Sequence, residues 1–170
     1  MSMTIDNKLL TAINEQVNAE FQAALIYQQL SYEMDALSLP GLCDWFASHA
    51  VEEQSHAAKF AQHLLDRSEK VALHTIEVPS LTINSALDAF KAAYDHEKKV
   101  SAMIRDLALI ADEVKDLDSR SLINFFLDEQ IEEEATVSEI VDQLELVGSD
   151  GSGILRIDAR LGGESTSEEA

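Results

Sequence analysis

The chain has 170 residues, of which 46% are hydrophobic, and this length and composition suit one domain with a sizeable buried core. Its 32 acidic side chains outnumber 12 basic ones, and a formal charge of −20 argues against a nucleic-acid partner because no basic surface could neutralise phosphates. The single cysteine excludes an internal disulfide and a zinc-finger cluster.

The beginning of the chain carries no targeting signal that we recognise. The first ten residues hold no basic segment followed by an apolar one, and no later stretch approaches the length of a membrane span. We therefore expect no membrane partner. We expect a cytoplasmic location, or the plastid stroma if the chain is a processed form from a photosynthetic eukaryote. The acidity fits either solubility or the attraction of cations.

Apolar residues recur at helical spacing, which predicts an all-α fold within a single domain over residues 1–170. Thr4 or Asp6 can cap the first helix, and Pro40 suits the first turn of the second. Ser85 can cap the third helix and Gly148 can end the fourth. The predicted helices lie at about residues 5–35, 41–68, 85–112, 118–147 and 153–161, and we expect a disordered tail at 162–170.

The segment from Val71 to Ile83 holds β-branched residues, a proline and no helical period, so we expect an extended connection. A second helix of about 28 residues would be ~42 Å long, and about 15 extended residues reach ~50 Å. The connection can therefore cross the whole bundle. This predicts a four-helix bundle of up-down-down-up topology, with one long crossover between helices two and three. The short fifth helix needs a partner surface, which we expect between subunits.

Polar residues interrupt the apolar stripe of each long helix. Glu53 and His56 are three residues apart, so their side chains point the same way on a helix. Gln130 and Glu133 repeat that spacing in the second half of the chain. The carboxylates Glu20 and Glu97 precede the two pairs by equal distances, which indicates one helical hairpin used twice. An acidic chain can also place carboxylates in register by chance.

The position of these side chains within apolar stripes favours a metal site. Burying an unpaired carboxylate costs several kcal/mol, and a cation offsets that cost. Antiparallel hairpins would bring both sets of polar side chains to one level of the bundle, as in the di-iron carboxylate proteins of this architecture.

Residues 5–161 resemble the ferritin family, and specifically its haem-free bacterial-type members. The motifs that carry the resemblance are Asn18-Ala19-Glu20, Glu52-Glu53-Gln54-Ser55-His56, Asp95-His96-Glu97 and Asp128-Glu129-Gln130-Ile131-Glu132-Glu133-Glu134. The resemblance implies an iron storage protein with ferroxidase activity. Such a protein oxidises Fe(II) to Fe(III) with dioxygen or hydrogen peroxide and stores ferric mineral in a hollow homo-oligomeric shell of 24 subunits.

The resemblance also implies a di-iron centre. One iron would take Glu20 and His56, Glu53 would bridge, and the second iron would take Glu97 and Glu133. Oxygen ligands with one imidazole suit iron, although zinc can occupy the same cage.

Further roles follow from the same resemblance. Gln130 would hold a water or an oxygen species by a hydrogen bond. Tyr27 would donate an electron or a hydrogen bond during oxygen chemistry, or it is an ordinary core tyrosine. A third iron site would take Glu52, Glu129 and Glu132 and share Glu133, unless these residues form a solvated acidic face.

The chain departs from its relatives at several positions. Bacterioferritins carry Glu-x-x-His in both halves, whereas Gln130 and Glu133 stand in the second half here, and Gln54 replaces the haem-ligating methionine, so we expect no haem. Residues Arg120 and Ile123 replace the three-fold channel carboxylates of animal ferritins. An acidic entrance near the turn at 112–118 is possible, although a solvated turn explains the same residues.

Two other functions remain compatible with the sequence. One is a non-catalytic metal-storing shell, in which the centre holds zinc or no metal. The other is a di-iron oxidase or peroxidase on the same bundle, although the cysteine pairs of a rubredoxin site are missing.

Overall fold

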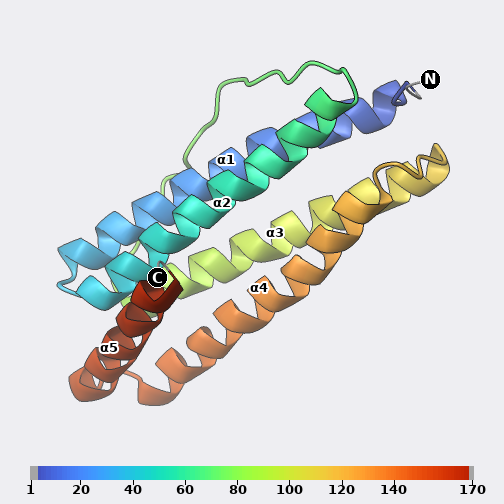
Figure 1. Cartoon of the computed structure of the whole chain (residues 1–170). Helices are drawn as coiled ribbons and strands as arrows, with labels where there is room; N and C mark the ends of the chain where they lie inside the picture. Colours follow the sequence, from blue (N-terminus) through green and yellow to red (C-terminus); the bar gives the residue numbers. More distant parts are fainter. Residues whose placement is uncertain (1–3, 169–170) are drawn as a thin grey trace.

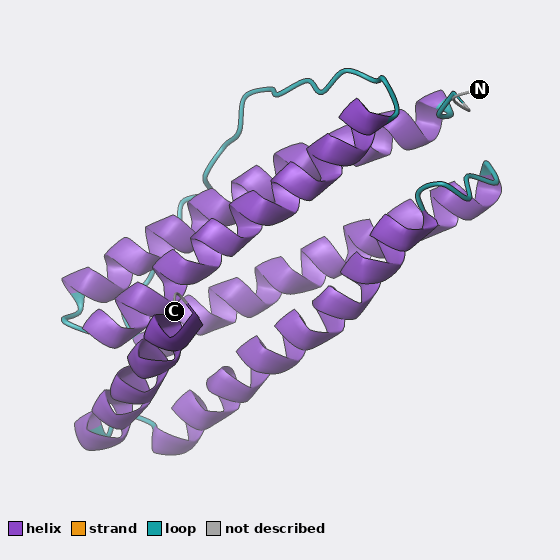
Figure 2. Cartoon of the chain, viewed as in Figure 1, coloured by secondary structure: helices purple, strands orange, loops and turns teal. Residues whose placement is uncertain are grey.

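Five helices account for most of the chain (Figure 1). A computed structural model describes the backbone of residues 4–168 and the side chains of residues 4–164, and every regular element in that range is helical (Figure 2). The helices are α1 (Asn7–Ala36), α2 (Pro40–Asp66), α3 (Ala86–Glu113), α4 (Arg120–Val147) and α5 (Gly151–Glu168). The all-α prediction is confirmed. None of the described helices combines the length and apolar character that a membrane crossing requires.

Local signals set the ends of most helices. Asp6 accepts a hydrogen bond from the Lys8 amide at 2.8 Å, and Ser85 accepts one from the Asp88 amide at 3.1 Å. Pro40 occupies the first turn of α2, where a missing N–H costs nothing. Gly148 ends α4 with a φ of 57°, a backbone conformation that favours glycine.

The four long helices form the predicted up-down-down-up bundle. α1 packs mainly on α2 and α3 mainly on α4, and the loop from the end of α2 to the start of α3 runs back along the bundle (Figure 1). Side-chain amides of α1 hold that loop. Asn14 exchanges two hydrogen bonds with the Ala72 backbone at 2.8 and 2.9 Å, and Gln22 donates to the Glu77 carbonyl at 2.8 Å. Asn14 and Gln22, eight residues apart on α1, thus supply hydrogen bonds to a loop that is not part of a helix or a sheet.

The apolar core consists of two clusters, one toward each end of the bundle. One contains Tyr27, Phe46 and Phe90, and the other contains Ile13, Phe60 and Phe126. Along each long helix, the buried residues predicted for the di-iron centre come between the members of the two clusters: Glu20, Glu53, His56, Glu97, Gln130 and Glu133. These six residues therefore form a polar layer across the middle of the apolar bundle.

Helix α5 extends further than the sequence predicts. The expected end near residue 161 and the expected disorder of residues 162–168 are wrong, because α5 continues to Glu168. Residues 169–170 of that predicted tail lie outside the described residues. α5 packs against α2, and a Cβ at Gly162 would lie only 2.7 Å from the Cα of Gly41. Glycines at both positions permit this close approach of the two helix backbones.

The start of α2 lacks a cap from its own neighbourhood. Leu39 precedes the helix and offers no side-chain hydrogen bond. Instead the carboxylate of Asp158 on α5, only 7% exposed, accepts a hydrogen bond from the Leu42 amide at 2.8 Å. A helix more than a hundred residues later in the chain therefore completes the α2 N-terminus, where a negative charge is favourable.

Replacing Asp158 with alanine should destabilise the protein. The Leu42 amide would lose its acceptor in a buried position, and loss of an N-cap costs ~1 kcal/mol. The measurement is the urea-induced unfolding of metal-free protein. Arg156→Ala, an exposed change on the same helix, is the matched control. Equal unfolding midpoints for the two variants would contradict the capping role.

Candidate metal centre

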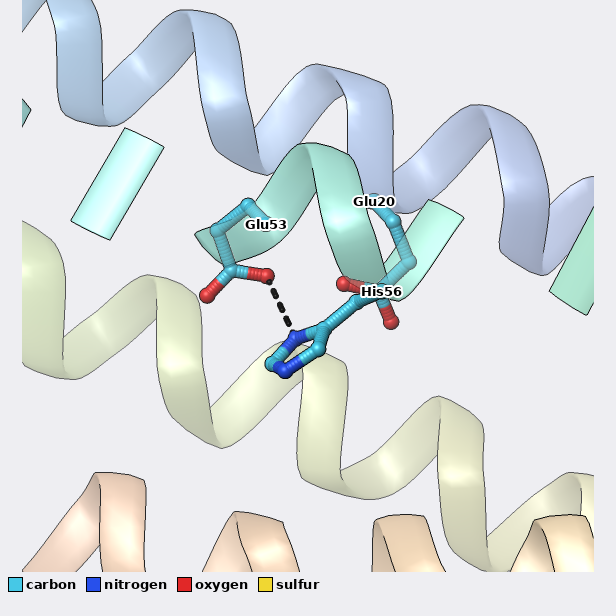
Figure 3. Close-up of side chains that lie close together, drawn as sticks. All are labelled: Glu20, Glu53 and His56. Carbon is cyan, nitrogen blue, oxygen red and sulfur yellow. Dashed lines mark hydrogen bonds and ion pairs between the residues drawn. The ribbon is translucent and has the colours of Figure 1, made fainter. Parts of the chain in front are cut away.

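Three buried side chains from two helices converge in the polar layer. Glu53 and His56 lie on α2 and Glu20 on α1, and ligand atoms of all three lie within 4.8 Å of one another (Figure 3). His56 Nδ1 is 3.2 Å from the nearer Glu53 oxygen. Each of the three side chains is at most 3% exposed. The predicted spacing of three residues on α2 thus produces the expected geometry.

Glu20 is held from one side only. Its Oε1 accepts a hydrogen bond at 2.7 Å from Gln16, one helical turn earlier, while its buried Oε2 has no hydrogen-bond partner. Burial first, and then the charge of Glu53, raise the pKa of Glu20 well above its usual value. Burial also raises the pKa of Glu53, followed by the charge of Glu97. The two carboxylates therefore need either protons or a cation.

Glu97 on α3 is fixed by two partners. Tyr27 donates a short hydrogen bond to its Oε1, and the Gln130 amide donates to its Oε2 at 3.1 Å. The same amide lies 3.1 Å from the Ser101 hydroxyl. Burial raises the pKa of Glu97 despite these two hydrogen bonds, which act in the opposite direction. Gln130 in this arrangement orients a carboxylate from the neighbouring helix.

Glu133 on α4 is 8% exposed, and within the described residues its carboxylate forms no hydrogen bond or ion pair. Burial first, and then the nearby carboxylates led by Glu97, raise its pKa to about 9. A carboxyl group in this condition is a strong candidate for a cation ligand, because a bound cation would offset both causes.

A second group of possible ligands lies on the other side of His56. Its Nε2 is 4.0 Å from Glu52 and 3.8 Å from Glu129, and these three residues also offer ligand atoms within 4.8 Å of one another. Glu132 and Glu133 line a cavity of about 250 Å³ together with Glu52 and Glu129. The residues predicted for a third site are therefore together, and His56 separates them from Glu20 and Glu53.

The structure also adds residues that the sequence analysis did not place in the site. Gln16 and Ser101 lie one turn from Glu20 and Glu97, so helical spacing alone would have identified them. Trp45 and His49 line the cavity on α2, and Glu164 of α5 lines it as well. Glu164 belonged to the segment predicted to be disordered, so no sequence signal pointed to it.

Carboxylates of the acidic turn at 112–118, a candidate entrance for iron, form ion pairs with basic side chains. Arg67 binds Asp116 at 2.5 Å, and Lys8 binds Glu113 at 2.5 Å. Ser119 donates to Asp116 at 3.2 Å rather than capping α4. These contacts fasten the α3–α4 turn to α1 and α2 and favour the structural explanation of its charge.

Comparisons with known proteins agree on one family. A family model described as a ferritin-like domain matches residues 10–147. A bacterial non-heme ferritin from Staphylococcus epidermidis is 33% identical over 165 residues, which cover 97% of this chain and 99% of the relative. A probable bacterial non-heme ferritin-like protein from Haemophilus influenzae is 30% identical over 162 residues, covering 95% and 98%.

Solved structures give the same result. An open pore ferritin from the archaeon Archaeoglobus fulgidus superposes with a TM-score of 0.90 at 33% identity, covering 93% of this chain and 98% of that one. These relatives are bacterial and archaeal, and none supports the plastid location considered above. With the bundle, the polar layer and the matched length in agreement, the chain belongs to the ferritin family.

Proposed function

We propose that this protein is a ferroxidase and an iron store. The observation that carries the proposal is the convergence of Glu20, Glu53 and His56 in one buried layer, with Glu97 and Glu133 near enough for their charges to act on Glu53. The ion pairs that lysines and arginines form among the described residues go to other carboxylates. Divalent cations are the compensation that this layer lacks, and oxygen ligands with one imidazole suit Fe(II).

Two Fe(II) ions are the substrates of the proposed centre. Glu20 and His56 Nδ1 bind one ion, Glu97 and Glu133 bind the other, and Glu53 lies between them. Two Fe(II) ions and dioxygen, with two protons, give two Fe(III) ions and hydrogen peroxide, which can itself serve as a further oxidant. Binding of the ions releases protons from the carboxyl groups, and the two protons that the oxidation consumes come from the solvent. Gln130 and Tyr27 keep Glu97 in position.

The cavity beyond His56 is the proposed third site. Glu52 and Glu129 face His56 Nε2, and Glu132 and Glu133 line the same cavity. Because Glu133 belongs to both sets, a cation can move from the buried layer into the cavity by exchanging ligands on one carboxylate.

The remaining parts of the proposal follow the family. We propose a cytoplasmic homo-oligomeric shell of 24 subunits, which encloses the ferric mineral and requires no haem, membrane or nucleic acid. Support comes from the names of the relatives, which are non-heme ferritins, and from the near-complete coverage of their chains.

Removing metal should make stability depend on pH in an unusual direction. In the unfolded chain Glu133 loses its proton near pH 4.5, whereas in the folded protein it keeps the proton up to about pH 9. Unfolding therefore releases a proton between these values, and the free energy of unfolding of metal-free protein should fall as pH rises. Glu20 and Glu53 act in the same direction.

Urea unfolding of chelator-treated protein at several pH values between these limits tests this prediction. Glu133→Gln should reduce the slope, and Glu139→Gln, an exposed change on the same helix, should not. Stability that rises over this range would show that the carboxyl groups of the layer are already ionised without metal.

Replacing Glu53 with alanine should abolish fast iron oxidation. Glu53 is the one carboxylate placed between the two proposed ions, so its removal should slow the oxidation by roughly tenfold or more. The shell should stay assembled, because the change removes a buried charge. Stopped-flow absorbance follows ferric iron after oxygen meets anaerobically loaded protein, and sedimentation reports assembly. Glu139→Ala is the control. If wild type and variant oxidise iron equally slowly, the protein is a passive metal-storing shell.

Replacing Glu129 with glutamine should remove one cation per subunit. The change keeps the volume of the side chain and removes the charge that faces His56 Nε2. Anaerobic Fe(II) titration followed by calorimetry measures the stoichiometry, with Glu139→Gln as the control. An unchanged stoichiometry would show that the cavity residues are only a solvated acidic face.

A further inference from the structure

Trp45 is the only tryptophan of the chain, and it lies beside the candidate metal centre. It is 3% exposed and lines the cavity that holds Glu52, Glu129 and Glu132. Its ring stacks on the imidazole of His49, with 3.7 Å between centroids and 25° between planes. One face of this indole is therefore in van der Waals contact with another conjugated ring.

His49 connects Trp45 to the buried layer. Its Nδ1 donates a hydrogen bond to the Trp45 carbonyl at 2.9 Å, one turn earlier on α2, and this contact fixes the ring. The other neighbour of the imidazole is Tyr27, at 5.9 Å between centroids and 37° between planes. Phe46 also packs against both Tyr27 and Trp45, with its ring centroid 5.9 Å from that of Tyr27 and 5.2 Å from that of Trp45. A continuous set of packed rings thus leads from the cavity to Tyr27, which donates a hydrogen bond to Glu97.

We propose that Trp45 is a redox-active residue that re-reduces Tyr27 after the tyrosine has given an electron to the oxidant. This inference rests on the proposed ferroxidase function and extends it. It gives Trp45 the task of moving the oxidising equivalent out of the buried layer and into the cavity where further Fe(II) binds.

Hydrogen peroxide, one Fe(II), the Tyr27 hydroxyl group and one proton give two waters, Fe(III) and a neutral tyrosyl radical. Trp45 then supplies an electron and its indole N–H proton, which restores the Tyr27 hydroxyl and leaves a neutral tryptophanyl radical. A further Fe(II) in the cavity, with a proton, reduces that radical and becomes Fe(III). Each cycle thus ends with both side chains intact.

The other aromatic side chains are poorer candidates for this step. Tyr32 is 62% exposed and forms none of the ring contacts of the path. Tyr94 has the Lys98 ammonium 4.6 Å from its ring centroid, and a positive charge there opposes the loss of an electron. Phenylalanine rings, including Phe46, can pack along the path but are much harder to oxidise. Trp45 is the oxidisable ring that contacts His49 and Phe46, the ring neighbours of Tyr27, and also lines the cavity.

Isotope labelling tests the proposal without changing a side chain. Because the chain has one tryptophan, protein grown with ring-deuterated tryptophan is labelled at Trp45 alone. The labelled shell is loaded with Fe(II) without oxygen, mixed with oxygenated buffer, frozen at intervals and examined by electron paramagnetic resonance. We expect a radical whose hyperfine structure narrows in the labelled protein. In Tyr27→Phe protein this tryptophan-derived signal should be absent.

A variant supplies the second measurement. In Trp45→Phe the tyrosine radical should last several-fold longer, because its reductant is missing while an aromatic ring still fills the site. Ferric iron formation without any label-sensitive signal, together with an unchanged lifetime of the tyrosine radical in Trp45→Phe, would overturn the proposal and leave the ferroxidase function standing. Failure to form ferric iron at all would instead overturn the ferroxidase function, and the inference with it.

Discussion

The burial of four carboxylates in one layer is the constraint on which the rest of the structure depends. Glu20, Glu53, Glu97 and Glu133 come from all four long helices and meet where water is scarce. Burial is the first cause that raises the pKa values of all four carboxyl groups, and the charges of neighbouring carboxylates raise those of Glu20, Glu53 and Glu133 further. A cation removes the cost of ionising them, so the same arrangement that weakens the metal-free bundle provides the driving force for binding.

The apolar parts of the bundle make this arrangement tolerable. Two clusters of buried side chains, one on each side of the polar layer, hold the helices together independently of the metal. Around the layer, amide and hydroxyl groups restrain the carboxylates without adding positive charge. Gln16 and Gln130 donate to Glu20 and Glu97, and Tyr27 donates to Glu97 as well. Neutral donors fix geometry and leave the charge for a cation to balance.

Much of this architecture was predictable because its determinants are local. Asp6, Pro40, Ser85 and Gly148 mark helix ends within a few residues of their observed positions, and the length of the crossover selects the topology. The pair Glu53 and His56 follows from helical spacing, which needs no tertiary information.

What escaped prediction depends on contacts between distant parts of the chain. The predicted end of α5 was wrong because glycine and small polar residues favour disorder when considered alone. In the structure, packing of Gly162 against Gly41 stabilises the helix. Glu164 reaches the cavity only because α5 is longer than expected. The stacking of Trp45 on His49 involves residues one turn apart, but nothing in their spacing shows that Tyr27 completes the path.

The contact between Asp158 and the Leu42 amide also affects how the chain matures during synthesis. A ribosome releases residue 42 long before residue 158, so any pairing of α1 with α2 during synthesis takes place while the first turn of α2 still lacks this cap. That turn becomes complete only when the last helix docks. The end of the bundle nearest α5 is thus the last part to become rigid, and only a fully translated chain presents it in its final form.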